Sequence, residues 1–480
     1  MPVAASRALA LSWFHHTLTA LAPQALVRAQ VPTLAWERYQ RVLVVAFGKA
    51  AGTMLDGVLP ALPAGADVYL ALPEGAPAPA PRANLDLHVF RGGHPQPNQE
   101  SLQAAAAMLA AARRGAATPA APPALLLALI SGGGSSLAEL PLGGDLEAAQ
   151  GLFRALVMSG APIGEINTVR RHQSAFKGGR LAAAAAAPHL EQVSWILSDV
   201  PGGDLSAVAS GPTCPDATTI EQAQAVLRRW LPGHASRQLG SAPSRAGQRA
   251  AVPLVRRQST PAHKRPAPGP PARSAGVAAG ATQQKVASYV ELCETPKPGA
   301  AAFARSRWLV LADNTAACAC LASRAREAGY APVAIDSTAD EWESTAAAQY
   351  LVDRWRRLRA AHRSTSRGPC LIAGGEVRVR VPPQSSGRGG RNQDLALRVA
   401  QALEDEEFCF LSAGTDGVDG SSDAAGACVD GATCARARAA GCDPSDHLAR
   451  FDAEPLLAAT GDLIRTGPTG NNLRDLRVFL

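Results

Sequence analysis

Short apolar runs that alternate with helical stretches constrain the fold of this chain more than any other feature. Such runs suit strands buried on both faces, and the helices between them cover those faces. In the first half of the chain the strand-like runs are residues 42–48, 68–72, 85–90, 125–131 and 193–199. Helical patterns at 99–114 and 148–159 separate several of them. The alternation predicts an α/β fold in which a parallel sheet carries helices on both faces.

The same pattern resumes in the last third of the chain. The strand-like runs there are residues 307–313, 331–335, 369–375, 377–381 and 408–414. The helical stretches are residues 314–328, 343–363 and 392–404. We interpret 369–381 as a hairpin around Gly374 and Gly375, and a hairpin among parallel strands predicts a mixed sheet in this second α/β domain.

A segment rich in Pro, Gly and Ser, residues 233–293, separates the two patterns. It lacks hydrophobic periodicity, and its composition is typical of a solvated, disordered connector. Its length favours a boundary between domains over a loop within one. We therefore expect an N-terminal domain at 1–232 and a C-terminal domain at 294–480, with this linker or insertion between them. A basic tail that binds an acidic partner is the alternative interpretation of the segment.

The net charge of +7 does not indicate a nucleic-acid-binding protein. Residues 233–290 carry nine Lys and Arg and no Asp or Glu, so the remaining chain is close to neutral. We expect no membrane partner either, because no apolar run reaches the roughly 18 residues that cross a bilayer. The nine scattered cysteines predict neither a disulfide framework nor a zinc site. No signal-peptide pattern is evident, so we expect a cytoplasmic protein, either a monomer or a homodimer.

Lysine is rare in this chain, since only five of the 47 Lys and Arg residues are lysines. A composition biased toward Ala, Arg, Gly and Pro favours arginine wherever a solvated cation suffices. A lysine that persists is therefore a candidate for a position where a compact ammonium is needed and a wide guanidinium is not tolerated. Lys49 and Lys177, the only lysines before residue 264, are the candidates, and chance survival is the alternative.

Polar, glycine-rich segments follow several predicted strands, and ligands of open α/β sheets bind at the carboxyl ends of strands. Lys49 follows the first strand and Asp199 follows the strand at 193–197. The segment SGGGSS follows the strand at 125–130, and it lacks the GK[ST] of a P-loop. Its glycine amides can turn inward as an anion nest, or the segment is only a tight turn. Its residues are Ser131, Gly132, Gly133, Gly134, Ser135 and Ser136.

Further candidates lie in other polar segments. In INTVRRHQSAFKGGRLA, Asn167 can cap a helix or contact a ligand, and the glycines after Lys177 allow close approach of a ligand. Arg391 starts a predicted helix, where a positive charge opposes the helix dipole, so we expect an anionic partner for it. Clustered aspartates in GTDGVDGSSD, Asp416 among them, suit Mg²⁺ and phosphates, although Asp-Gly turns offer a plainer reason for them.

Ten motifs in one order resemble the glycerate 2-kinases, the class II glycerate kinases of the MOFRL family. They are AFGKA, GGHPQPNQES, LISGGGSS, INTVRRHQSAFKGGRLA, LSDVPGGDLSAVASGPT, ETPKPG, GGE, GGRNQDLAL, SAGTDGVDGSSDAAGA and TGPTGNNLRDL. The resemblance covers nearly the whole chain apart from residues 233–293. Departures are Asp394 and Asn471, where the family often has Glu and Thr, and Asn98, which replaces an acid and leaves any acid role there in doubt.

The resemblance implies a Rossmann-like N-terminal domain with a parallel sheet, a smaller C-terminal domain (core about 369–476) and an active site in the cleft between them. It implies ATP, Mg²⁺ or another divalent cation, and phosphorylation of D-glycerate at its 2-hydroxyl, with Lys49 and Arg391 central to the transfer. Asp199 and Asp416 are our candidates for metal ligation, and Asp199 also for the catalytic base. The remaining expected contacts of substrate or phosphate are the SGGGSS residues, Asn167, Lys177, Glu376, Asn392, Gln393 and Thr415.

Three other functions stay open. A reductase acting on hydroxypyruvate or tartronate is one, although no GxGxxG follows a strand with an acid about 20 residues later. Phosphorylation of the 3-hydroxyl is the second, and a non-catalytic protein that binds sugar acids is the third.

Overall fold

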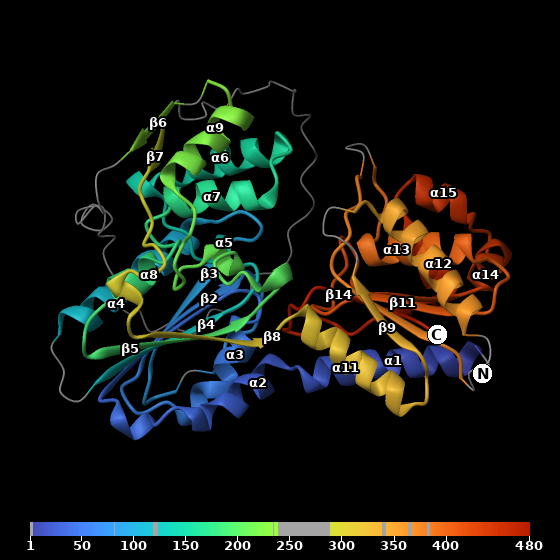
Figure 1. The fold of residues 1–480 in the computed structure, drawn as a ribbon, viewed down its shortest axis with the longest axis horizontal. Coiled ribbons are helices and arrows are strands. Elements are labelled where there is room, and N and C mark those ends of the chain that lie inside the picture. The colour runs from blue at the N-terminus through green and yellow to red at the C-terminus, as the bar shows by residue number, and fades with distance from the viewer. Residues whose placement is uncertain are drawn as a thin grey trace, which may run out of the picture.

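The computed structural model describes residues 3–80, 82–118, 123–233, 235–238, 289–337, 342–362, 367–381 and 385–480. Two α/β domains lie side by side, each built on a six-stranded sheet (Figure 1). The predicted fold class is therefore confirmed. Among the residues that the structure describes, no helix has the length and apolar character needed to cross a bilayer.

The first sheet is entirely parallel and has the strand order β3-β2-β1-β4-β5-β8. Its strands are β1 (Arg41–Phe47), β2 (Asp67–Pro73), β3 (Asp86–Gly92), β4 (Ala124–Ile130), β5 (Leu190–Leu197) and β8 (Ser306–Ala312). The apolar run of β1 supplies two cores, since Val44 packs with Met54 on one face and Val45 with Met108 on the other. Helices α2 (Pro23–Gln30) and α3 (Ala51–Val58) cover the first face, and α4 (Gln99–Ala117) and α8 (Arg180–Ala184) cover the second.

A further layer lies above this sheet and has its own small core (Figure 1). It consists of α6 (Leu146–Met158), α7 (Ile163–Gln173), α9 (Ile220–Trp230), β6 (Ala235–Gln238) and β7 (Tyr289–Leu292). Strand β6 pairs in parallel with β7, so the chain leaves and re-enters this domain at neighbouring points. The segment predicted to link the domains is therefore an insertion within the N-terminal domain. Its residues 239–288 lie outside the described residues.

The second sheet has the order β13-β12-β11-β14-β10-β9 and is mixed, as predicted, because only β9 and β10 pair in parallel. Its strands are β9 (Val333–Ser337), β10 (Cys370–Gly374), β11 (Cys409–Gly414), β12 (Gly426–Asp430), β13 (Leu463–Ile464) and β14 (Asp475–Phe479). The predicted hairpin at 369–381 is wrong, because β14 and β9 occupy both sides of β10. Residues 377–381 instead form a surface run whose first residue, Val377, is buried, with one bridge between Arg378 and Glu343.

Helices cover both faces of the second sheet. One face carries α12 (Ser344–Ala361), α13 (Arg391–Ala402), α14 (Thr433–Ala439), α15 (Pro444–Ala449) and α16 (Ala453–Ala459). The other carries α11 (Asn314–Glu327) and α1 (Val3–Ala20), which runs from the N-terminal domain beneath the second sheet (Figure 1). Trp13 of α1 meets Tyr330 edge-on at 5.6 Å, and Arg7 pairs with Asp430 at 2.9 Å and Asp462 at 2.7 Å.

Two elements thus lie in a different domain from the one expected. Helix α1 falls within the predicted N-terminal range 1–232 but packs on the second sheet. Strand β8 falls within the predicted C-terminal range 294–480 but pairs with β5 of the first sheet. The hydrophobic pattern identifies each element but not its partner, because an apolar face can be buried against either sheet.

Candidate active site

The carboxyl ends of β1 and β4 meet at the edge of the first sheet that faces the C-terminal domain. Gly48 has φ 126°, and a Cβ there would lie 2.2 Å from Ser131 Oγ, so only glycine permits this approach. The Ala50 amide donates to Ser131 Oγ at 3.0 Å, and the Lys49 amide donates to the Gly132 carbonyl at 2.9 Å. These bonds fix the backbone of Lys49 against the SGGGSS loop.

The side chain of Lys49 reaches the C-terminal domain. Its Nζ lies 3.6 Å from Oδ2 of Asp416, which follows β11. The lysine stem passes beside Gly133, where a Cβ would come within 3.1 Å of Lys49 Cγ. About a third of the Lys49 side chain is exposed, so its ammonium is open to a ligand between the domains.

Asp199 packs directly on the glycine loop. A Cβ on Gly132 would lie 1.8 Å from Asp199 Oδ2, and the same oxygen accepts a 3.1 Å hydrogen bond from Asn472 Nδ2 of the C-terminal domain. Burial raises the pKa of Asp199, and the Glu376 carboxylate raises it further, against the lowering effect of Lys49. Asp199 therefore holds a proton more readily than an ordinary aspartate.

Lys177 supports the loop from beneath, without contact with the cleft. Its side chain is fully buried, pairs with Glu139 and donates to the Ser135 carbonyl at 2.6 Å. Burial lowers the pKa of Lys177 to about 8, although Glu139 opposes that shift. Asn167 is also nearly buried and accepts a 2.9 Å hydrogen bond from Arg170, while Ser135 Oγ bonds Ser210 Oγ at 2.8 Å. In this structure Lys177 positions the loop, and the ligand contacts expected for Lys177 and Asn167 stay predictions.

Arg391, at the start of α13, has two carboxylates of the protein as anionic partners, and an anionic ligand there stays a prediction. Its Nε and Nη2 donate to the two oxygens of buried Asp475 at 2.7 and 2.9 Å, and Nη1 pairs with Glu376 at 2.9 Å. Burial alone would lower the pKa of Arg391, but Asp475 and Glu376 outweigh it and raise that pKa. The guanidinium stays charged and is held in a fixed orientation.

Three other predicted contact residues are buried and form hydrogen bonds to other groups of the protein. Asn392 and Gln393 are fully buried, and their amides and side chains donate to the Asp419 carboxylate, at 2.9 Å for the Gln393 amide. An acid at the start of α13 is favoured by the helix dipole, so Asp419 is the anion at that helix end. Thr415 is buried as well, and its hydroxyl donates to the Arg474 carbonyl at 2.8 Å. The structure brings none of the three to the cleft.

A cavity of about 710 Å³ adjoins Arg391 on the C-terminal domain. The start of α13, the surface run 377–381 and the loop at Gly420 form its walls. Its size lies within the range of small-molecule sites. Gly389 and Gly390 line it together with three arginines, Arg378, Arg380 and Arg391, and two acids, Glu343 and Asp394.

Comparisons with known proteins agree on one family. Residues 9–238 match a domain of unknown function (DUF4147), and residues 369–475 match the MOFRL family. The chain is 32% identical to the D-glycerate 2-kinase of Thermotoga maritima over 474 residues, which cover 98% of this chain and 97% of that protein. A crystal structure of glycerate kinase from the same organism superposes with a TM-score of 0.74 and covers 99% of both chains.

The chain belongs to the MOFRL-type glycerate kinases. A putative hydroxypyruvate reductase of Agrobacterium vitis is also similar, at 35% identity over 453 residues, 92% of this chain and 87% of that protein. The resemblance drawn from the ten motifs is confirmed.

Within this glycerate kinase fold, sequence reasoning missed three site residues. His94 lies against Gly133, with its Nε2 3.3 Å from the position of a Cβ there, beside Lys49. Burial and the nearby Lys49 ammonium lower the pKa of His94 to about 4. Asn472 holds Asp199, and Glu139 holds Lys177. His94 stands in the motif GGHPQPNQES, which was a signal, whereas nothing local in the sequence marks the other two.

Proposed function

We propose that this protein transfers the γ-phosphoryl group of ATP to the 2-hydroxyl of D-glycerate and releases 2-phosphoglycerate and ADP. One observation carries the proposal: groups from both domains converge at the carboxyl edge of the first sheet. Those groups are the SGGGSS loop, Lys49, Asp199, Asp416 and Asn472. The D-glycerate 2-kinase relative supports the choice of substrate.

The glycine loop and Lys49 would bind the transferred phosphoryl group. Within the described residues, no acceptor takes the amide hydrogens of Gly132 and Gly133, and both glycines lie beside the lysine stem or Asp199. Inward-turned amides form an anion site, and the ammonium adds a point charge. In phosphoryl transfer the protein itself does little covalent chemistry, so charges held in position supply most of the catalysis.

Asp199 would act as the general base. As the glycerate oxygen attacks the γ-phosphorus, its proton passes to the Asp199 carboxylate. The bond from that phosphorus to the oxygen bridging the β-phosphate breaks, and ADP leaves with the electron pair. The raised pKa of Asp199 makes it a better proton acceptor than an ordinary aspartate, and Asn472 fixes its orientation.

The cleft also suits a divalent cation. The Glu376 carboxylate is close enough to raise the pKa of Asp199, so two acids repel each other there. Hard carboxylate oxygens are the protein ligands that Mg²⁺ prefers. Asp416 and Glu376 would hold it, which leaves the Asp199 carboxylate free to act as the base. When bound, Mg²⁺ neutralises charge on the triphosphate.

The cavity beside α13 would receive ATP. Its arginines and glycine backbone suit a triphosphate, and Arg391 connects the cavity with Glu376 in the cleft. With Asp475 fixing one edge of Arg391, its outer edge would contact the phosphoryl group or the glycerate carboxylate. Closure of the two domains would then exclude water and limit ATP hydrolysis.

A hydroxypyruvate reductase is the second candidate, and the Agrobacterium vitis relative favours it. The loop after β1 is Gly48-Lys49-Ala50, and it lacks the glycine pattern that lets a dinucleotide pyrophosphate rest on a helix start. A reductase therefore requires a different nucleotide site from the usual one.

One experiment separates the candidates. The protein is incubated with D-glycerate, ATP and Mg²⁺ and, in parallel, with hydroxypyruvate and NADH, while ADP and NADH are followed. NADH consumption without ADP release would overturn the kinase proposal. Phosphorus NMR of the product distinguishes 2-phosphoglycerate from 3-phosphoglycerate.

Lys49→Arg tests the role of the ammonium. Because a guanidinium cannot take the place of the compact charge beside Gly133, we expect a loss of kcat on the order of 100-fold or more, with the melting temperature unchanged. Lys297→Arg is the matched control, since Lys297 is equally exposed but pairs with Glu294, away from the cleft. Full kcat in Lys49→Arg would contradict the proposed role.

A further inference from the structure

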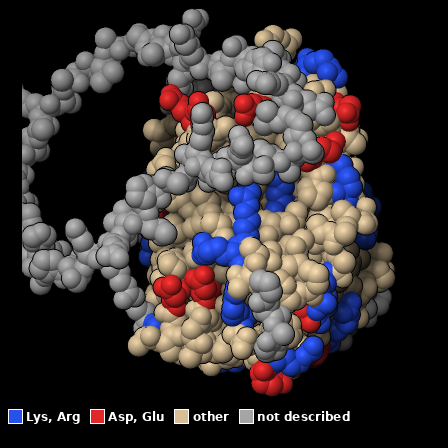
Figure 2. Space-filling model, turned by 90° about the vertical axis from the view of Figure 1, so that its left-hand side faces the viewer, with Lys and Arg blue, Asp and Glu red and all other residues tan. Residues whose placement is uncertain are grey.

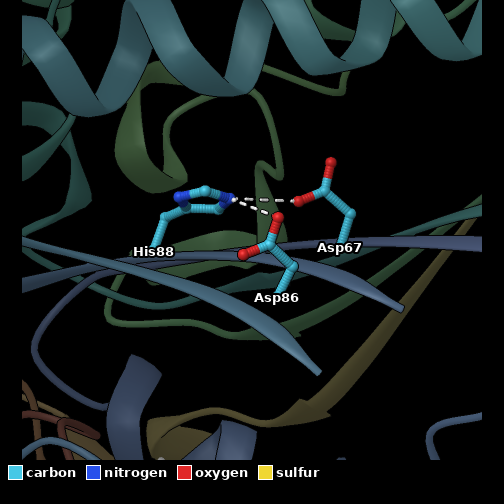
Figure 3. A group of neighbouring side chains, drawn as sticks. All are labelled: Asp67, Asp86 and His88. Atoms are coloured by element: carbon cyan, nitrogen blue, oxygen red, sulfur yellow. Dashed lines mark ion pairs between the residues drawn. The ribbon is translucent and has the colours of Figure 1, made fainter. Parts of the chain in front are cut away.

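Two acids and a histidine converge far from the cleft, at the amino ends of β2 and β3 (Figure 3). The strand register places Asp67 beside Asp86 and Tyr69 beside His88, so all four side chains share one face of the sheet. Like charges directly opposite each other on neighbouring strands destabilise a sheet. A cation near Asp67 and Asp86 would remove that repulsion.

The distances in this cluster suit a metal ion better than direct hydrogen bonds. His88 Nε2 lies 3.4 Å from Asp67 Oδ1 and 3.3 Å from Asp86 Oδ2, and the three ligand atoms lie within 4.8 Å of one another. Charge-assisted N–H···O bonds are shorter, at about 2.7–2.9 Å. Ligands about 2.0–2.1 Å from a tetrahedral ion are separated by roughly 3.3–3.4 Å, the spacing that His88 makes with each acid.

Neighbouring side chains hold the ligand atoms in place. Asp67 Oδ1, which faces His88, is screened from solvent and takes part in no hydrogen bond. The Tyr69 hydroxyl donates to the other oxygen, Oδ2, at 3.2 Å, and it accepts from Arg114 at 3.0 Å. Arg114 also lies 3.9 Å from Oδ2. The His88 ring stacks on Tyr69 at 4.5 Å. Such outer contacts are what fix metal ligands before the ion binds.

We propose that Asp67, Asp86 and His88 bind one divalent transition-metal ion of the Zn²⁺ class, with solvent in the open position. An imidazole with two carboxylates suits Zn²⁺ or Co²⁺, whereas Mg²⁺ prefers oxygen ligands alone. Because β3 is the edge strand of the first sheet, the ion would hold β3 to its neighbour β2.

This site is separate from the catalytic cleft. The strands of the first sheet run toward the C-terminal domain, so their amino ends lie on the opposite side of the molecule (Figure 1). That side is the one viewed in Figure 2, where Lys and Arg groups lie among smaller groups of Asp and Glu. The ion would therefore stabilise the sheet and take no part in phosphoryl transfer.

Metal titration of the full-length protein tests the proposal. Protein stripped with a chelator is titrated calorimetrically with Zn²⁺ near neutral pH in excess Mg²⁺, and the visible absorption of added Co²⁺ is recorded. We expect wild type to bind one ion that His88→Gln binds on the order of 100-fold more weakly. The control is His16→Gln, which changes an exposed histidine on α1 and should match wild type.

Equal stoichiometry and affinity in wild type and His88→Gln would overturn the proposal. Because the proposed Zn²⁺ site is remote from Lys49, we expect the ADP-forming rate of His88→Gln to equal that of wild type. Asp86→Asn is the second variant, since Asp86 is largely exposed and its replacement leaves the core intact. It should weaken binding of the same ion, and wild-type affinity in Asp86→Asn would also contradict the proposal.

Discussion

The buried pair of Lys177 and Glu139 offers a test of how the glycine loop is supported. Lys177→Met would remove the ammonium and leave the Glu139 carboxylate, 1% exposed, with only the Leu140 amide at 2.9 Å as a described donor. Breaking a buried ion pair from one side costs about 3–5 kcal/mol. The nearby Arg170 guanidinium, which Glu139 also attracts, offsets part of that cost.

We therefore expect Lys177→Met to lower the unfolding free energy of the N-terminal domain by about 3–4 kcal/mol at pH 7. Lys177→Met with Glu139→Gln should recover part of the stability, because the buried acid is removed, while Arg170 loses the charge of Glu139. Differential scanning calorimetry suits this comparison, because it resolves the transitions of a two-domain protein that a single unfolding free energy would merge.

The same variant should affect the site. Without the Lys177 bond to the Ser135 carbonyl, the loop loses one of its supports, so we expect a higher KM for the phosphate-bearing substrate. Two results would refute this reasoning: a loss below about 1 kcal/mol in Lys177→Met, or a double variant no more stable than the single one.

The remaining predictions concern the cleft and the first helix. Asp199→Asn should abolish most activity. In wild type, kcat/KM should fall as the pH drops through the raised pKa of Asp199, which lies above that of an ordinary aspartate. A fall in kcat/KM only near the usual aspartate pKa would count against Asp199 as the base. His94→Ala should lower kcat roughly tenfold, the value of one hydrogen bond to a ligand, and His94→Gln should restore part of it; a wild-type rate in His94→Ala would leave His94 without a role. Trp13→Ala should destabilise the C-terminal domain by about 3–5 kcal/mol in calorimetry, because Trp13 is 2% exposed and packs on Tyr330, whereas His16→Ala on the same helix should have little effect.

The sequence was sufficient to predict most strands and the meeting of Lys49, the glycine loop and Asp199 at one edge of the sheet, because both depend on local pattern. Continuous apolar runs identified β1, β4 and β5, and the residues directly after them gave Lys49, the glycine loop and Asp199. Carboxyl ends of neighbouring parallel strands meet at one edge, so the residues just beyond these strands lie close together in the fold.

What the sequence could not reveal were pairings between distant residues. Asn392 and Gln393 resemble ligand contacts until Asp419, 27 residues away from Asn392, is seen to take their donors. In the same way, Arg391 needs an anion, but its partner Asp475 is 84 residues distant. A buried carboxylate and a bound phosphate satisfy such donors equally well. A local sequence pattern therefore cannot distinguish a structural hydrogen bond from a contact with a ligand.

The scarcity of lysine acquires a physical basis in the fold. Three of the five lysines lie in the described residues, and each ammonium has defined partners. Lys49 passes beside Gly133 toward Asp416, and Lys177 lies fully buried on Glu139. Lys297 donates to the Thr295 hydroxyl at 2.8 Å and pairs with Glu294. A planar guanidinium is wider than an ammonium and needs room for a fork of donors, which the buried site of Lys177 does not provide. Composition therefore identified two positions where size as well as charge is required, and only at Lys49 is that charge open to a ligand.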